Sequence, residues 1–291
     1  MLFCSNGTMC TAILRLGPAG TVLLAGVRDE FASRAWQPPA RYWPAIPDVL
    51  GGRDLLAGGT WLAVAPAAQR VACVLNGRGQ MAPAGTRRSR GTLPLSAAAE
   101  GRLEAPADLA AFDPFRLLIA EAGRAVLMSW DGVDLTEREL SPGLHIVVNG
   151  GVVGDTAPGA MTGPADTAAA ADTGPGGLTA EEAAAARARE QARIGHFLPR
   201  LHAARPPQPV PGRTVAAAWG DWLPLLDGDG IPPEDQRALI VRRDFGHGRI
   251  WGTTSISLAA ITPAGLRYDF TATPGDPAAW YPVPLEPVPP S

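Results

Sequence analysis

The pair Met9-Cys10, near the start of the chain, has the most direct chemical consequence of any feature in the sequence. If translation begins at Met9 and Met9 is then trimmed off, Cys10 carries a free α-amino group beside its thiol. A thiol is a nucleophile, and an α-amine with an ordinary pKa of about 7.7–8.0 can take its proton directly or through a water. Cys10 would then supply both halves of a catalytic dyad. The alternative is an ordinary buried cysteine in a first strand.

The other residue types narrow the chemistry that the chain can use. All 25 basic residues are arginines, which excludes a Schiff-base or general-base lysine. Besides Cys10 there are two cysteines, Cys4 and Cys73, and the spacing of the three indicates neither a closed set of disulfides nor a zinc module. Cys73 lies in an apolar run typical of a core strand. The four histidines lie in separate segments, so we expect no metal ion, no cofactor and no Cys/His dyad.

The overall composition describes a globular protein without the charge pattern of a polyanion binder. The chain has 291 residues, 46% of them hydrophobic, and a net charge of -3, so we expect no nucleic-acid partner. No stretch approaches the roughly 18 consecutive apolar residues of a membrane helix, and no basic segment precedes an apolar run as in a signal peptide. We therefore expect a soluble, cytoplasmic protein without membrane insertion, and its oligomeric state stays open.

The elements that must position Cys10 are mainly antiparallel strands. Apolar runs in the first half come in pairs joined by short turns with glycine or proline, which is the pattern of β-hairpins. Hairpins with helices grouped between them favour an α+β fold over a parallel nucleotide-binding sheet. We expect strands at residues 11–16, 21–27, 60–65, 70–76, 115–121, 125–130, 144–148, 238–242, 254–261 and 266–271, helices at 95–111 (interrupted near Pro106), 179–201 and 215–223, and a Pro-rich loop at 37–48.

The segment 150–177 differs from the rest of the chain in composition. It consists almost wholly of Gly, Ala, Thr, Pro and Asp, with too few large apolar groups to offset the entropy lost on ordering. We interpret it as a disordered insertion within a single domain that spans residues 10–291. Residues 1–9 are then an extension or a mis-assigned start.

A helix is expected directly after this insertion. Thr179 and Glu182 have the spacing of a capping box, which marks a helix N-terminus. The arginines Arg187, Arg189 and Arg193 follow on this helix. They suit a nucleic-acid contact, but a solvated helix face is the favoured interpretation.

Short motifs occur in a fixed order along the first half of the chain. They are residues 9–11 (MCT), 27–31 (VRDEF) with Ser33-Arg34, 58–62 (GGTWL), 71–76 (VACVLN), 88–91 (RSRG) and 140–143 (LSPG) with Asn149. This ordered set resembles the NRDE family, also called the transport and Golgi organisation family. The resemblance covers Met9 to about Asn149 and resumes weakly over residues 252–258.

The resemblance implies an αββα sandwich of two mainly antiparallel sheets, like that of the N-terminal-nucleophile hydrolases. It places Cys10 in the position of the nucleophile, Arg28 and Asp29 as a charged pair at the end of the second strand, and Asn76 and Asn149 at polar positions. The chemistry of these side chains agrees with the positions that the resemblance assigns to them. A guanidinium close to a thiol favours the thiolate, a carboxylate can orient an ammonium group, and amide N–H groups can donate to a developing oxyanion.

Each of these residues also has a structural interpretation. Arg28 and Asp29 can form an ion pair that holds the Pro-rich loop. Asn76 and Asn149 each precede a glycine and can be turn residues. Trp61, on an apolar strand, is more often a core residue than a ligand platform.

Two positions depart from the family pattern, and both lie near the expected site. Val27 stands where the family name calls for asparagine, which removes a polar side chain. Thr254 stands where the family usually has an arginine, and Arg249 is close enough in sequence to replace it. Glu30 is expected to be a surface or loop-capping residue.

Two classes of function fit this sequence. The first is a cysteine amidohydrolase with Cys10 as its N-terminal nucleophile, acting on the C–N bond of small acylated amides through a thioester acyl-enzyme. The second is a non-catalytic protein on the same scaffold that handles an apolar ligand such as haem or a lipid, as is associated with family members linked to secretory-pathway organisation in eukaryotes. Either way the expected partner is a small molecule, and the fold by itself does not decide between them.

Overall fold

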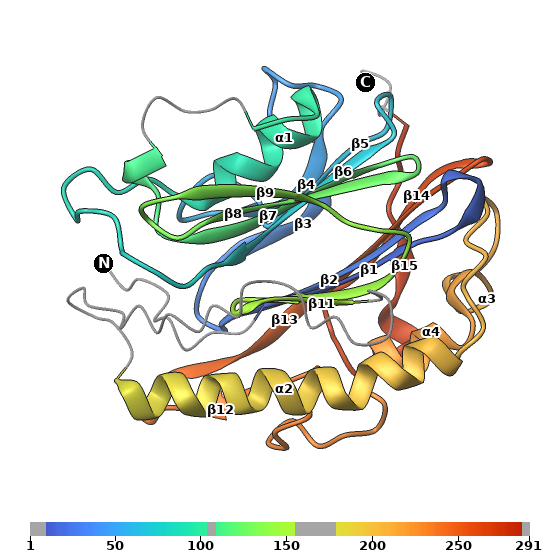
Figure 1. Cartoon of the computed structure of the whole chain (residues 1–291). Coiled ribbons are helices and arrows are strands. Elements are labelled where there is room, and N and C mark those ends of the chain that lie inside the picture. Colours follow the sequence, from blue (N-terminus) through green and yellow to red (C-terminus); the bar gives the residue numbers. More distant parts are fainter. Residues whose placement is uncertain (1–9, 104–108, 155–178, 287–291) are drawn as a thin grey trace.

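Two antiparallel β-sheets packed face to face form the centre of the molecule (Figure 1). The computed structural model describes residues 10–103, 109–154 and 179–286. Within these residues sheet A has eight strands, in the order β11 (Gly151–Gly154), β10 (Gly143–Val148), β1 (Thr11–Leu16), β2 (Val22–Phe31), β13 (Ile250–Thr262), β14 (Gly265–Thr271) and β15 (Tyr281–Pro282), with β12 (Arg242–Asp244) paired to β13. Sheet B has seven described strands, in the order β3 (Trp36–Ala40), β4 (Leu50–Asp54), β5 (Leu62–Ala65), β6 (Arg70–Asn76), β7 (Phe115–Glu121), β8 (Arg124–Trp130) and β9 (Leu135–Glu139).

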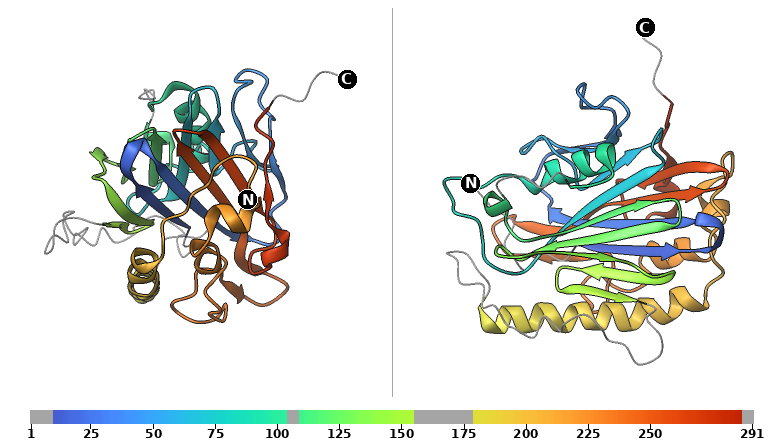
Figure 2. Two further views of the ribbon diagram at one scale, coloured as in Figure 1. Left: turned by 90° about the vertical axis from the view of Figure 1, so that its right-hand side faces the viewer. Right: turned by 45° about the horizontal axis from the view of Figure 1, so that its top comes forward.

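Helices cover the outer face of each sheet, which gives four layers in the order αββα. α1 (Leu93–Glu100) lies on sheet B, and α2 (Ala180–Ala203), α3 (Val215–Trp219) and α4 (Trp222–Leu226) lie on sheet A (Figures 1 and 2). Short 3-10 turns complete the described elements: η1 (Pro18–Gly20), η2 (Arg90–Thr92), η3 (Leu109–Ala111) and η4 (Pro277–Ala279). The predicted α+β sandwich of two antiparallel sheets is confirmed. None of the helices in the described part of the chain has both the length and the apolar character to span a bilayer.

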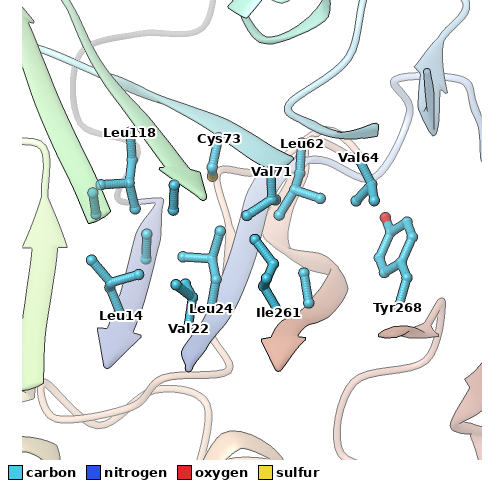
Figure 3. Packing of buried hydrophobic residues seen from close by; sticks show 14 of the residues in the cluster. Leu14, Val22, Leu24, Leu62, Val64, Val71, Cys73, Leu118, Ile261 and Tyr268 are labelled. Atoms are coloured by element: carbon cyan, nitrogen blue, oxygen red, sulfur yellow. The ribbon is translucent and has the colours of Figure 1, made fainter. Parts of the chain in front are cut away.

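The central strands of sheet A are buried on both faces because their side chains alternate between two apolar clusters. Leu14 and Leu24 point between the sheets, where they pack with residues such as Leu62 of sheet B (Figure 3). Ile13 and the other odd-numbered residues of β1 and β2 point to the opposite face, under Trp219 and the neighbouring helix residues. This period of two follows from the geometry of a strand. It also decides on which face each functional side chain lies.

The hairpin of β1 and β2 is the part of sheet A that positions the expected site. Its register pairs Thr11 with Val27, so the residue before the strand, Cys10, lies opposite Arg28. β13 runs along the other side of β2, where Thr253 pairs with Asp29 and Ser255 with Arg28. The register shifts between these two pairs, so Thr254 is an extra residue in a β-bulge.

Most predicted elements of the first half are confirmed, and the errors have local causes. The predicted Pro-rich loop at 37–48 contains most of β3, and the predicted strand at 60–65 begins only at Leu62. The predicted helix over 95–111 already ends at Glu100, because Gly101 adopts a φ of 75° and donates its N–H to the Ala97 carbonyl. Pro106, the expected interruption, lies outside the described residues.

The second half shows larger departures. The segment 150–177 is ordered at its start, because β11 pairs with β10 and Val152 packs against the core between the sheets; residues 155–177 lie outside the described part of the chain, as do residues 1–9. The capping box at Thr179 is present as predicted, and α2 runs to Ala203, two residues beyond the predicted end. The predicted helix at 215–223 is two short helices, since Gly220 with a φ of 49° separates α3 from α4. The strand predicted at 238–242 begins instead at Arg242.

Candidate active site

Cys10 lies immediately before β1 and is partly buried. It is on the interior face of sheet A, where it packs against the core between the sheets, and its thiol donates to the main-chain carbonyl of Asp29 over 3.8 Å. Burial, and then the charge of Asp29, raise the pKa of the Cys10 thiol to about 12. In the chain in which Cys10 is joined to Met9, the thiol is therefore protonated at neutral pH.

Arg28 and Asp29 follow one another on β2 and therefore point to opposite faces of sheet A. Arg28 shares the interior face with Cys10, whereas Asp29 shares the face covered by α2 with Val27. The interpretation of Arg28 and Asp29 as a structural ion pair is wrong, because among the described residues the carboxylates within salt-bridge distance of Arg28 are those of Glu30 and Asp54. The two charges flank Cys10 from different sides.

Arg28 belongs to a set of four charged side chains that we call the interior-face network: Arg28, Glu30, Arg34 and Asp54. Arg28 Nη2 lies 3.6 Å from Asp54 Oδ2 and 3.9 Å from Glu30 Oε2. Arg34 Nε lies 2.5 Å from Asp54 Oδ2 and 3.5 Å from Glu30 Oε2. Two positive and two negative groups thus balance one another. Glu30, expected at the surface, is buried and also accepts the N–H of Phe31.

One face of the Arg28 guanidinium lies over an aromatic ring. Its Cζ is 4.5 Å from the ring centroid of Trp61, a cation–π contact. The Trp61 ring is also so close to Gly52 that a Cβ there would lie 2.2 Å from ring atom Cη2. Trp61 therefore packs against the core, as expected, and in addition holds Arg28 near Cys10.

Asp29 belongs to a second set on the opposite face, the helix-face cluster of Asp29, Thr253, Arg193 and Thr11. Its Oδ1 accepts the hydroxyl of Thr253 over 2.6 Å, and its Oδ2 lies 4.0 Å from Arg193 Nη1. Arg193 Nη1 also donates to Thr11 Oγ1 over 2.6 Å. Burial raises the pKa of Asp29 to about 7, although the charge of Arg193 acts against this rise.

The expectation that Arg193 lies on a solvated helix face is wrong. Arg193 is 1% exposed, and its Nε donates to the Ala238 carbonyl over 2.9 Å. The signal that could have revealed this is the spacing of α2, since its buried residues recur three or four positions apart, as in an amphipathic helix. They are Ala186, Glu190, Arg193, Phe197 and Leu201.

The two expected asparagines lie in different sheets. Asn149 follows β10, the neighbour of β1, and is buried; the register pairs Val148 with Thr11, so Asn149 lies beside Cys10 in the sheet. Asn76 is the last residue of β6, where strand alternation puts it on the outer face with Ala72. The structure thus brings together Cys10, Arg28, Asp29 and Asn149.

Two of the sequence motifs meet at a pair of glycines. The N–H of Thr60 donates to the Gly91 carbonyl over 2.8 Å, which joins segment 58–62 to segment 88–91. A Cβ on Gly59 would lie 2.4 Å from the carbonyl carbon of Gly91, so only glycine fits at this crossing. This contact fixes the loop that carries Trp61.

The two departures from the family pattern have different surroundings. Val27 is 3% exposed and packs in the apolar cluster under α2, where an asparagine would have to bury its amide. Thr254, at the bulge, accepts a hydrogen bond from Arg28 Nη1 over 2.8 Å. Arg249, proposed as a replacement for the missing arginine, lies over the ring of Phe31, 5.6 Å from its centroid.

The fold and the site define an αββα protein whose first central strand begins at a cysteine flanked by charges on both faces. The chain belongs to the family described as Transport and Golgi organisation 2, whose model matches residues 9–164. This confirms the NRDE resemblance. Among solved structures, the chain is similar to the Caenorhabditis elegans ortholog of N-acylethanolamine-hydrolyzing acid amidase, with 10% identity and a TM-score of 0.42 over 94% of this chain and 100% of that chain. No curated protein sequence matches the chain.

Proposed function

We propose that this protein is a cysteine amidohydrolase that uses Cys10, freed at its N-terminus, to cleave small acylated amides. One observation carries the proposal: Cys10 stands at the start of a central strand with the Arg28 guanidinium on its own face and the Asp29 carboxylate on the other. A core cysteine needs neither charge, and burying both near it costs free energy, a cost that a catalytic role for these groups would explain.

The pKa of the thiol explains why the free amine is needed. With Cys10 in peptide linkage the pKa is about 12 and few thiolates form at neutral pH. Removal of Met9 exposes an α-amine, a base on the same residue with an ordinary pKa of about 7.7–8.0. This amine takes the thiol proton as sulfur attacks, so the nucleophile no longer depends on a free thiolate.

The reaction then proceeds in two balanced steps. The sulfur of Cys10 forms a bond to the amide carbonyl carbon, the C–N bond breaks, and the amine product leaves with the proton that the α-amine had taken. Water next attacks the thioester, the C–S bond breaks, and the acid product leaves while the thiol regains a proton. Both steps pass through a tetrahedral oxyanion, which hydrogen-bond donors stabilise.

The neighbouring residues take distinct roles in this proposal. Arg28 favours negative charge on sulfur, and Asp29 orients the ammonium form of the α-amine. Asn149, which lies beside Cys10 in the sheet, offers its side-chain amide to the oxyanion. Asn76 lies on the outer face of sheet B, so it has no direct role in this version of the mechanism.

The test begins with the mature form of the protein, prepared by cleaving a removable tag to leave Cys10 as the first residue. Hydrolysis of N-acyl aminocoumarins with acyl chains of different length reports amide cleavage. We expect Cys10→Ser to lower kcat/KM by about 10³-fold or more, because an alkoxide is far harder to form than a thiolate. Cys73→Ser is the matched control, since Cys73 is a buried core cysteine of sheet B.

Intact mass after a single turnover gives a second readout. An acyl adduct on the mature wild type, absent from Cys10→Ser and present in Cys73→Ser, supports the proposal. Equal turnover in mature wild type and Cys10→Ser would contradict it. Binding of haem or a fatty acid that survives Cys10→Ser, without any adduct, would favour the carrier function instead.

A further inference from the structure

Arg193 connects two strands of sheet A and the segment before β12, from a helix that lies outside the segment matched by the family model. Its Nη1 donates to Thr11 in β1 over 2.6 Å and lies 4.0 Å from the Asp29 carboxylate in β2. Its Nε donates to the Ala238 carbonyl, in the segment before β12, over 2.9 Å. A guanidinium is planar and carries its donors in a rigid fork, so contacts on several sides fix its orientation.

We infer that Arg193 is the positioning residue of the Cys10 site: it holds the Asp29 carboxylate and Thr11, the residue bonded to Cys10, in one fixed frame. The inference rests on the proposed function, because the frame matters for chemistry only if Cys10 acts with its α-amine. Arg193 does not touch the reacting atoms. It acts through Asp29, which must be ionised and correctly placed to hold the ammonium group of Cys10.

The geometry is that of a closed cluster, not of a surface ion pair. Asp29 is 3% exposed and Arg193 is 1% exposed, so the attraction between them is weakly screened by water. Thr253 donates to the other carboxylate oxygen over 2.6 Å. Through Oδ1 the Asp29 carboxylate thus accepts a hydrogen bond from a hydroxyl of β13. Its Oδ2 has no hydrogen-bond partner among the described residues and faces the guanidinium of α2 at 4.0 Å.

Other charged groups also face this cluster. Arg243 of β12 and Arg28 of β2 both favour the ionised form of Asp29, but less strongly than Arg193 does. Glu190, one turn before Arg193 on α2, forms an ion pair with Arg78, with 2.8 Å between Glu190 Oε1 and Arg78 Nη2. The thiol of Cys10 is protonated in the chain described here and adds no charge of its own.

Replacing Arg193 should therefore change the titration of Asp29. Arg193→Met keeps the length and packing of the side chain but removes the charge, so the pKa of Asp29 rises from its value of about 7. Arg193→Lys keeps a charge without the planar fork and should move the pKa less. Arg187→Met is the matched control, because Arg187 is exposed on the same helix.

The experiment follows Asp29 directly in the full chain by carbon-13 NMR with labelled aspartate carboxyls. Its signal is identified by its loss in Asp29→Asn and by a midpoint far above that of ordinary aspartates. We expect Arg193→Met to raise this midpoint by about one pH unit or more, with Arg193→Lys intermediate and Arg187→Met unchanged. An unchanged midpoint in a folded Arg193→Met variant would overturn the inference; if that variant does not fold, Arg193→Lys decides on the same criterion.

Kinetics of the mature protein separate this inference from the proposed function. The acidic limb of the kcat/KM profile should move to higher pH by the same amount as the Asp29 midpoint, with little change at the pH optimum. A purely structural role would lower activity at all pH values and leave the limb in place, which would overturn the inference. Absence of turnover in mature wild type, with the Asp29 midpoint still shifted by Arg193→Met, would instead overturn the proposed function.

Discussion

The end of β2 carries charged side chains on both faces of sheet A, and the two faces balance their charges in different ways. On the interior face, Arg28 and Arg34 meet Glu30 and Asp54, all from β2, β4 and the turn after β2. On the helix face, Asp29 depends on a guanidinium from a helix 164 positions later, at Arg193. The first set is built almost entirely from one stretch of sequence, and the second forms only when the distant helix docks.

This difference has a consequence for stability. In the interior-face network the loss of one charged side chain leaves several charged neighbours that can rearrange. The Arg34 side chain is also 19% exposed, so water can solvate the carboxylates that lose it as a partner. In the helix-face cluster the Asp29 and Arg193 side chains are 0% and 1% exposed. Removing one partner of such a pair leaves a buried charge without compensation. The helix face should therefore be the more fragile of the two.

The largest expected effect is a stability loss from Arg193→Met. At pH 8, where Asp29 is mostly ionised, we expect the free energy of unfolding to fall by about 3–5 kcal/mol, because the buried carboxylate loses its counter-charge. Urea denaturation measures this, with Arg34→Met as the comparison on the interior face, expected to cost about 1 kcal/mol or less. Equal losses in the two variants would remove the distinction between the faces.

The next effect is a pH dependence that belongs to Asp29. The pKa of Asp29 is about 7 in the folded protein and about 3.9 in an unfolded chain, so the folded state binds this proton more tightly. Its contribution to stability is most favourable below about pH 4 and is lost as pH rises through about 7. Asp29→Asn lacks this dependence. From pH 4 to pH 8 we expect wild type to lose on the order of 3–4 kcal/mol relative to the variant.

Denaturation curves at several pH values test the sign as well as the size of this effect. Glu190, whose pKa is also raised by burial, titrates in both proteins and cancels in the difference. Parallel stability profiles for wild type and Asp29→Asn would show that Asp29 is not a strained carboxylate. That result would make the helix-face cluster an ordinary ion pair.

The predictions from sequence succeeded where structure is local and failed where it depends on distant partners. The hairpin of residues 11–31 was visible in its alternation and in its Gly-Pro turn, and so was the hairpin of residues 115–130. The sequence does not predict β4, because its residues, LGGRD, have neither alternation nor β-branched side chains. It does not predict β9, because its residues, LTERE, are polar after the first leucine. Neighbouring strands, and not their own propensity, make these segments strands.

The candidate site divides along the same line. Cys10, Arg28 and Asp29 were identified from short motifs, and the register of β1 and β2 indeed brings them together. Arg193 was assigned to solvent, because a buried arginine has no signal of its own; only its spacing with Phe197 on α2 marks the face. Nor does the sequence indicate that the register shifts at Thr254, since a bulge depends on the pairing of two strands.

A smaller effect is expected on the interior face from Gly52→Ala. The added Cβ would meet the Trp61 ring at 2.2 Å, so the ring that lies over Arg28 must shift. We expect a loss of about 1–3 kcal/mol in the free energy of unfolding, as is usual for an overpacked contact. Gly85→Ala is the control, because no atom lies within 4 Å of a Cβ built there.

The Gly52→Ala variant also tests whether Arg28 and Asp29 act separately. Displacing Trp61 disturbs the interior face, whereas Asp29 on the other face keeps its contacts with Arg193 and Thr253. The pKa of Asp29 should therefore stay unchanged. The rate at which iodoacetamide alkylates the Cys10 thiol of the mature protein should change. A shift of the Asp29 midpoint in Gly52→Ala would show that the two faces are coupled through the sheet.

The smallest effect belongs to Thr254, the bulge residue in the position where the family usually has an arginine. Thr254→Val keeps the shape of the side chain but removes the hydroxyl that accepts from Arg28 Nη1 and donates to the Arg28 carbonyl over 3.3 Å. Arg28 retains its carboxylates at 3.6 and 3.9 Å, so the loss should come mainly from the hydrogen bond to the charged guanidinium, about 1.5 kcal/mol. Thr136→Val, on the exposed part of β9, controls for a threonine-to-valine change in a strand.

Thr254→Arg sharpens the same comparison, because it adds a third guanidinium to the interior-face network, which already contains those of Arg28 and Arg34. If the interior-face network is balanced as it stands, the added charge is repelled, and the variant should be less stable at low salt than at high salt. An arginine that instead stabilises the protein at low salt would mean that the interior face carries surplus negative charge. The interior face would then lack a positive charge that the family's arginine supplies. The pairing of Arg28 and Arg34 with Glu30 and Asp54 would no longer explain why threonine is tolerated at position 254.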